Sequence, residues 1–479
     1  MATLRDSAGL ITSTGDAASL EHFEQALASL FRSDGNALPV IERALEHDPI
    51  FAAAHCLRAG ALVLSGGDTH AAALAASVAA IEGNSGANER ERRHAAAARR
   101  WLGGSVVRAS RLYGELLRDY PRDRLALLVT HGLDFRLGRR KLLRDRIARV
   151  LPYWNTSDRE YGYVLGMHAF GLEETGNYDL AMAEAHHSLA LVPDNAAAIH
   201  VIAHVLEMRG PPDKGIAWLR ETQPIWIGNA GFRIHLAWHL ALFQIDADGA
   251  KDALSTYDDL IAPRLDGGNN GLVDASALLW RLQLHGSGSQ WRWREVTGLW
   301  TRRRSIGNRA FDLVHAVMAF AASKQLGRAR QLATRLKNDP MLRARSGSEE
   351  LALAEPLIAA FMSFARGDYA AAVEQISAVK AAADRCGGSV AQCDLIHLTL
   401  LEAALRGHRQ RLARALADER AVRKPASRLN RWLKARAWTL GTGELAGRAS
   451  GVRRAAPASV HAYRSDIFAT TSPVLAGPS

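Results

Sequence analysis

One segment with the pattern of a helix–turn–helix unit restricts the fold more than any other feature of the sequence. Within 176–198, Gly176 opens the pattern, small residues such as Ala181 recur through it, and Pro193 closes it. The glycine permits a turn between two helices, the small residues let those helices approach closely, and the proline ends the second helix. Gly210 lies 34 residues after Gly176 and marks the next turn. A period of this length predicts stacked pairs of helices.

Looser copies of the same unit recur along most of the chain, in 38–62, 106–138, 215–224, 249–263, 327–340 and 367–379. Alanine, leucine and arginine are abundant and β-branched residues are sparse, which favours helices over strands. The unit resembles the tetratricopeptide repeat (TPR), a helix pair of about 34 residues. We therefore expect an all-α fold, a TPR-like right-handed α-solenoid of antiparallel helix pairs with a concave central groove.

The extent of the helical pattern also predicts the domain boundaries. We expect a flexible N-terminus over 1–18 and the α-solenoid over 19–438. The remaining segment, 439–479, is rich in glycine, alanine, serine and proline, a composition typical of chains that do not build a core. We expect it to be a disordered or extended C-terminal tail.

The chain is strongly basic, but its basic residues are mostly interspersed with acids. The formal net charge is +11, and only 406–436 gathers arginine and lysine closely. This distribution is typical of solvated helix faces, so we expect no nucleic-acid partner. Docking of 406–436 on nucleic acid or on a membrane is a weaker alternative.

Cysteine usage and the apolar runs bear on the compartment. The three cysteines, Cys56, Cys386 and Cys393, are too few for a disulfide framework, and no second pair joins the last two in a zinc site. The N-terminus has no apolar signal core, and the longest apolar run, 71–81, is shorter than a membrane span. We expect a cytoplasmic protein without a membrane span, and the sequence allows an oligomer.

The turn glycines bring equivalent residues of three units into register. Counted back from Gly176, Gly210 and Gly249, the third residue is always acidic: Glu173, Glu207 and Asp246. The sixth residue back is Phe170, His204 or Phe243. The tenth is Gly166, His200 or His239. These offsets lie on one helical face, and in TPR arrays that face lines the concave groove. An acid in the last turn opposes the helix dipole, so its recurrence indicates either function or pairing with arginines across the groove.

Two histidine pairs with a four-residue spacing carry the chemistry of this face. They are His200 and His204 in "AIHVIAHVLEM" and His235 and His239 in "HLAWHLALF". Side chains four residues apart project from the same face of a helix and can bind one metal ion. No HExxH, P-loop or GxSxG motif is present, which excludes a zincin mechanism. A divalent metal at His200, His204 and His239 is an alternative to a surface without any cofactor.

Polar residues early in later helices extend the same expected surface. The full set of expected ligand-binding residues is Glu173, His200, His204, Glu207, His235, His239, Asp246, Asp274, Asp312 and His315. The first functional hypothesis is recognition of a partner protein segment or a small molecule in this groove. The alternative is an enzyme, of hydrolase or lyase type, that uses the same side chains in acid–base or metal-assisted chemistry.

A combination of motifs is more specific than the repeat alone. The segments that make up this combination are "GYVLGMHAFGLEETGNYDLAMAEA", "AIHVIAHVLEM", "HLAWHLALF", "LVDASALLWRLQL" and "DRIARVLPYW". With them, the chain resembles the tetratricopeptide repeat protein 38 family over about 20–435. The resemblance implies an all-α, TPR-like protein of cytoplasmic type. It implies no particular activity and no catalytic residues.

Overall fold

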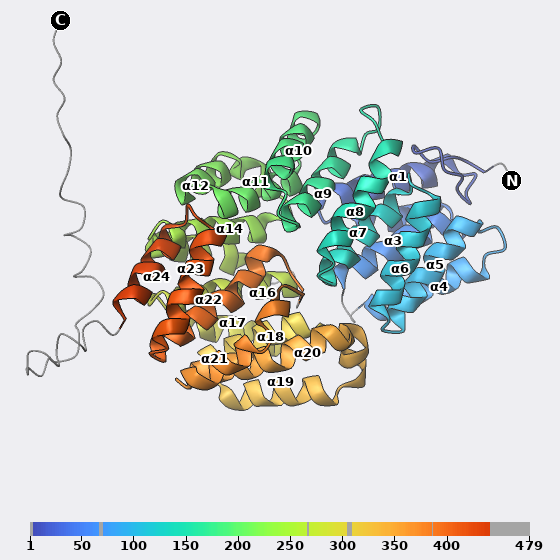
Figure 1. The fold of residues 1–479 in the computed structure, drawn as a ribbon. Coiled ribbons are helices and arrows are strands. Elements are labelled where there is room, and N and C mark those ends of the chain that lie inside the picture. Colours follow the sequence, from blue (N-terminus) through green and yellow to red (C-terminus); the bar gives the residue numbers. More distant parts are fainter. Residues whose placement is uncertain (1–2, 67–69, 266–267, 304–308, 386, 441–479) are drawn as a thin grey trace, which may run out of the picture.

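The computed structural model describes residues 3–66, 70–265, 268–303, 309–385 and 387–440. Regular secondary structure in these ranges is helical, with one isolated β-bridge between Arg5 and Ile11 and no strand. The expected all-α fold is therefore confirmed (Figure 1). Most of the expected C-terminal tail, from residue 441 onward, lies outside the described residues.

The helices follow one another with short connections along the described chain. The first group is α1 (Ala17–Arg32), α2 (Ala37–His47), α3 (Ala52–Ser65), α4 (Ala71–Gly83), α5 (Glu89–Leu102), α6 (Val106–Asp119), α7 (Arg124–Arg136) and α8 (Arg140–Val150). The second group is α9 (Tyr161–Glu174), α10 (Tyr178–Leu191), α11 (Ala196–Arg209), α12 (Pro212–Glu221), α13 (Gln223–Trp226), α14 (Arg233–Asp246) and α15 (Ala250–Thr256). The third group is α16 (Asn269–Leu284), α17 (Gln290–Arg302), α18 (Ala310–Ala322), α19 (Leu326–Asn338), α20 (Pro340–Ala365), α21 (Tyr369–Ser377), α22 (Val390–Arg406), α23 (Gln410–Arg423) and α24 (Arg428–Thr439).

The turn between α9 and α10 shows how the sequence pattern produces the local structure. Gly176 has a φ of +82°, in the left-handed region that glycine adopts without a Cβ clash. Its N–H donates a hydrogen bond of 2.8 Å to the carbonyl oxygen of Glu173, at the end of α9. The side chains of Ala181 and Ala185 in α10 are fully buried, and α9 and α10 pack together. Their small size allows this close packing.

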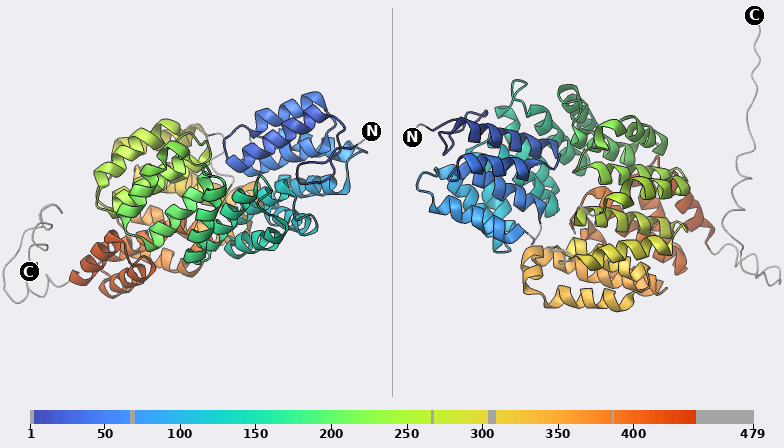
Figure 2. Two further views of the ribbon diagram at one scale, coloured as in Figure 1. Left: turned by 90° about the horizontal axis from the view of Figure 1, so that it is seen from above. Right: turned by 180° about the vertical axis from the view of Figure 1, so that it is seen from behind.

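Consecutive helices pack against one another, and the row of helices curves back on itself. The course of the chain runs from α1–α8 through α9–α14 to α16–α21, and α22–α24 return alongside the middle of the chain (Figures 1 and 2). Contacts of α22 with α16 and of α24 with α14 close this return.

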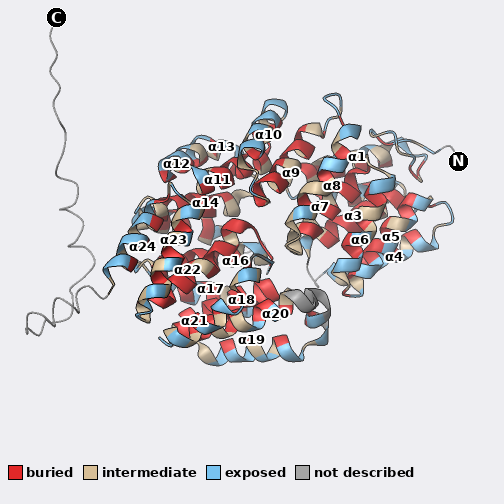
Figure 3. Cartoon of the chain, in the orientation of Figure 1, coloured by how far each residue is buried: buried red, intermediate tan, exposed pale blue. Residues whose placement is uncertain are grey.

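The returning segment lies against the helix face that the sequence places around a groove. The N–H of Val390, at the start of α22, donates to Glu174 of α9 at 3.0 Å. Gln392 donates to Asp274 of α16 at 3.0 Å. The C-terminal helices therefore occupy part of the space that we expected to be an open groove. Buried residues accordingly lie on the faces between helices, and exposed ones on the outer faces (Figure 3).

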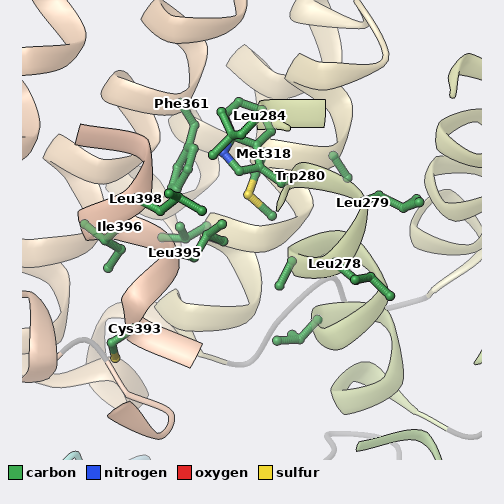
Figure 4. Close-up of a cluster of buried hydrophobic side chains, with 14 of the residues drawn as sticks. Leu278, Leu279, Trp280, Leu284, Met318, Phe361, Cys393, Leu395, Ile396 and Leu398 are labelled. Carbon is green, nitrogen blue, oxygen red and sulfur yellow. The ribbon is translucent and has the colours of Figure 1, made fainter. Parts of the chain in front are cut away.

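Tryptophans in the middle of the chain build the core, as the sequence suggests. Trp280 of α16 is fully buried and lies edge-on to Phe361 of α20, with 5.2 Å between the ring centroids. Its Nε1–H donates a 3.0 Å hydrogen bond to the hydroxyl of Thr399, on α22. Leu395 and Met318 lie nearby in the same apolar cluster (Figure 4). The core thus ties the returning helix α22 to α16, α18 and α20.

Residues 3–16, part of the N-terminus that we expect to be flexible, make defined contacts in the structure. The backbone of Leu4 is hydrogen-bonded to that of Thr14 and of Thr12, each at 2.9 Å, and this closes a tight loop. Asp6 in the loop is buried and faces Arg124 of α7 at 3.3 Å. The buried guanidinium of Arg124 takes Asp6 and Ser7 of this loop as partners, in addition to Glu24 of α1.

Candidate metal centre

Four histidines from two neighbouring helices meet in one cluster. His200 and His204 come from α11, and His235 and His239 from α14. The ring centroids of His200 and His204 are 4.2 Å apart, those of His204 and His239 are 4.6 Å apart, and those of His235 and His239 are 4.8 Å apart. One ring nitrogen of each histidine lies within 4.8 Å of those of the others. The four-residue spacing brings each pair to one helix face, and the packing of α11 against α14 joins the pairs.

Three of the four histidines donate a hydrogen bond from Nδ1 to a carboxylate. The Nδ1–H of His204 donates to Glu173 of α9 at 3.0 Å. His239 is paired with Glu207 of α11 at 3.2 Å, and His235 with Asp274 of α16 at 2.8 Å. Each carboxylate therefore comes from a helix next to that of its histidine.

Two of these pairs follow from the repeated sequence pattern. Their acids, Glu173 and Glu207, each stand three residues before a turn glycine. Glu173 pairs with a histidine 31 residues later, and Glu207 with one 32 residues later. The acid at the end of one helix thus reaches a histidine of the next equivalent helix. The alternative that these acids pair with arginines across the groove does not describe these contacts: a histidine ring binds each carboxylate, and Glu207 also binds Lys424.

The opposite ring nitrogens have no such partners. The Nε2 atoms of His200, His204 and His239 are buried, and none has a hydrogen-bond partner among the described residues. A buried polar atom without a partner is unfavourable. In His204 and His239, whose Nδ1–H is bound to a carboxylate, Nε2 carries the lone pair, which is the arrangement of histidines that bind metals.

The protonation of the cluster follows from burial and the nearby carboxylates. Burial lowers the pKa of His200 and of His239 well below the ordinary value, so both rings are neutral near pH 7. Burial also acts to lower the pKa of His204, but the carboxylates of Glu173 and Glu174 outweigh it and raise that pKa. The same negative charges favour a metal cation at the centre.

A second layer of contacts holds the carboxylates. Glu207 accepts a hydrogen bond of 2.5 Å from the Nζ of Lys424, which lies just after α23. Burial acts to raise the pKa of Glu207, but Lys424 and His239 hold it well below its ordinary value. Burial, together with the charge of Glu173, raises the pKa of Glu174 to about 7. Arg140 of α8 lies 3.0 Å from the carboxylate of Glu174 and limits that rise.

Three of the expected ligand-binding residues lie outside this cluster. Asp246 accepts hydrogen bonds from the hydroxyl of Ser427 and the backbone N–H of Leu429, each at 2.7 Å, so it anchors the start of α24. Asp246 therefore lies outside the histidine cluster, although it lines a neighbouring cavity together with Glu207. The next equivalent helix, α16, supplies Asp274 to the cluster instead of a histidine.

Asp312 and His315 of α18 are buried, and neither belongs to the cluster of four histidines. The Nδ1–H of His315 donates to the carbonyl oxygen of Phe311 in its own helix at 2.9 Å. A carboxylate oxygen of Asp312 accepts from Asn269 at 3.4 Å. The seven residues that do assemble are Glu173, His200, His204, Glu207, His235, His239 and Asp274.

Three residues at the site are not predicted by the sequence pattern. Glu174 is adjacent to Glu173 but falls outside the repeated register, and Gln392 and Lys424 belong to the returning segment. No local pattern connects these last two to the histidines, because they reach the site only through the return of the chain.

The basic stretch 406–436 is largely engaged within the molecule. Arg420 is paired with Asp394 at 2.9 Å, and Arg436 with Glu402 at 2.5 Å. These contacts use charges that docking on nucleic acid or a membrane would require. Cys393 is buried and its Sγ donates to the carbonyl oxygen of Gly387, whereas Cys386 lies outside the described residues.

No helix among the described residues has both the length and the apolar character that a bilayer crossing requires. The chain matches no family model.

Proposed function

We propose that the protein binds a divalent transition metal at the four-histidine cluster. The observation that carries the proposal is the hydrogen bonding of the clustered rings. His204, His235 and His239 hold a carboxylate at Nδ1, and the Nε2 atoms of His200, His204 and His239 are buried without a hydrogen-bond partner among the described residues. Carboxylate–histidine pairs of this kind orient ligands and increase their basicity. Imidazole ligands suit zinc, copper, iron and nickel, and zinc is the probe used below.

The burial of the site supports a small ion over a partner protein segment. The side chains of His204 and Glu173 are each only 1% exposed, and that of His239 is 0% exposed. The start of α22 lies across the neighbouring helices α9 and α16. An extended segment cannot reach these atoms while α22 is in place, whereas a metal ion needs only a narrow path.

We further propose that the helices form a TPR-like right-handed α-solenoid whose last helices return to its concave face. The glycine turn between α9 and α10 and the packing of consecutive helices support this architecture. Membership of the tetratricopeptide repeat protein 38 family and a cytoplasmic location stay predictions.

Metal analysis of purified protein tests the proposal. We expect the wild-type protein, loaded with zinc and dialysed, to retain about one equivalent per chain. We expect the His204→Ala/His239→Ala variant to retain almost none, because two Nε2 ligands are lost. The matched control is His186→Ala/His187→Ala, which removes two exposed histidines of α10. Equal zinc retention by both double variants and the wild type would contradict the proposal.

The carboxylates are expected to tune the affinity. Glu173→Gln keeps an acceptor oxygen for the Nδ1–H of His204 and removes only the negative charge. We expect zinc affinity, measured by competition with a chromophoric chelator, to fall roughly 10–100-fold. The control is Glu184→Gln, which changes the carboxylate that binds His168 at 2.7 Å outside the cluster. An unchanged affinity in Glu173→Gln would show that this pair does not serve the metal.

A further inference from the structure

We infer that the centre has three protein ligands, His204, His235 and His239, and an exchangeable fourth position beside His200 that takes a small oxygen or nitrogen donor. This inference rests on the proposed metal binding. It assigns different roles to four histidines that the sequence pattern alone treats as two equivalent pairs.

The four histidines differ in their hydrogen bonding at Nδ1. His204, His235 and His239 each hold a carboxylate at Nδ1, at 3.0, 2.8 and 3.2 Å. His200 has no such carboxylate partner among the described residues. Histidines that bind metals nearly always donate their second N–H to an oriented acceptor, so three rings have the support of a ligand and the fourth does not.

His200 lies beside two phenylalanine rings that reach the surface. Its ring lies 5.5 Å from that of Phe170 and 5.6 Å from that of Phe232, and both phenylalanines are partly exposed. The neighbouring ring of His235 is 20% exposed, whereas His204 and His239 are almost completely buried. His200 itself is buried, so a ligand that reaches the metal approaches past the partly exposed ring of His235 and the two phenylalanine rings that pack on His200.

A centre of three histidines with one free position is the arrangement of catalytic zinc sites, whereas structural sites use all four positions for protein ligands. A metal ion there polarises a bound water or carbonyl oxygen. The phenylalanine rings beside the free position favour a donor oxygen attached to an apolar or aromatic group. The ligand class is therefore a small carboxylate or carbonyl compound with such a group.

Zinc affinities of single variants test the number of protein ligands. We expect His239→Ala to weaken zinc binding more than about 100-fold, beyond the range that loss of a supporting carboxylate causes. We expect His200→Ala to remain within about tenfold of the wild type, since it loses no ligand. Circular dichroism checks the fold, and His200→Gln replaces His200→Ala if the alanine variant unfolds. A loss in the His200 variant as large as that in His239→Ala would overturn the inference and show four protein ligands.

The absorption spectrum of the cobalt-loaded protein tests the free position. We expect azide to change the visible d–d bands of the wild-type protein in a saturable way. We also expect benzoate to displace azide at lower concentration than acetate does, and Phe232→Ala to reduce that difference. A spectrum that azide leaves unchanged would overturn the inference while cobalt binding itself upholds the proposed function. A wild-type protein that binds neither zinc nor cobalt would overturn both.

Discussion

Zinc added to the metal-free protein is expected to raise the free energy of unfolding by about 4 kcal/mol when free zinc exceeds its dissociation constant roughly a thousandfold. The reason is that the folded state holds histidines of α11 and α14 together with their carboxylates, whereas the unfolded chain does not. Urea unfolding, followed by circular dichroism over a series of free zinc concentrations, measures the gain. The gain should increase with the logarithm of zinc concentration above the dissociation constant.

The His204→Ala/His239→Ala variant is the control for this stabilisation. It should unfold at the same urea concentration with and without zinc, and a chelator should return the zinc-loaded wild type to the metal-free curve. A gain of the same size in the double variant would locate the stabilising metal elsewhere. A wild-type curve that zinc leaves unchanged would count against metal binding by the folded state.

Arg124→Met is expected to lower the free energy of unfolding by about 3–5 kcal/mol, the usual effect of breaking a buried ion pair from one side. The side chain of Arg124 is 1% exposed. Its guanidinium lies 2.6 Å from Glu24 of α1, 2.6 Å from the hydroxyl of Ser7 and 3.2 Å from Glu160. Methionine fills a similar volume but leaves these carboxylates without their cation. Urea unfolding at constant pH measures the difference.

Hydrogen exchange gives this prediction a local readout. In Arg124→Met, the amides of residues 3–16 should exchange faster than in the wild type, because Arg124 of α7 binds Ser7 and Asp6 of this loop. The control is Arg32→Met, which removes an arginine paired with Asp34 at the surface and should change stability little. An Arg124→Met protein as stable as the wild type would show that the loop and α1 do not depend on this network.

The sequence predicts the all-helical fold and the meeting of the histidines because both depend on local periodicity. Spacing of four residues places His200 and His204 on one face, and the turn glycines place Glu173 and Glu207 in the same register. These relations need only the geometry of one helix and of its neighbour. The structure realises them as hydrogen bonds between consecutive equivalent helices.

The parts that the sequence does not predict depend on contacts between distant segments. Asp246 shares the register of Glu207, but the return of α24 supplies Ser427 and Leu429 as its partners. Lys424 lies 217 residues after the glutamate that it binds. The order of the N-terminal loop depends likewise on Arg124, more than a hundred residues away. Periodicity carries no information on which distant segment covers a helix face.

The return of the C-terminal helices gives the site an order of assembly during translation. All four histidines and two of their carboxylates precede residue 240, whereas Asp274, Gln392 and Lys424 are synthesised later. At roughly 5–20 residues per second, Lys424 follows His239 by about 10–40 s. During that interval the nascent chain has the histidine cluster without the segment that covers it. The order of synthesis thus leaves the centre accessible to metal before the last helices close over it.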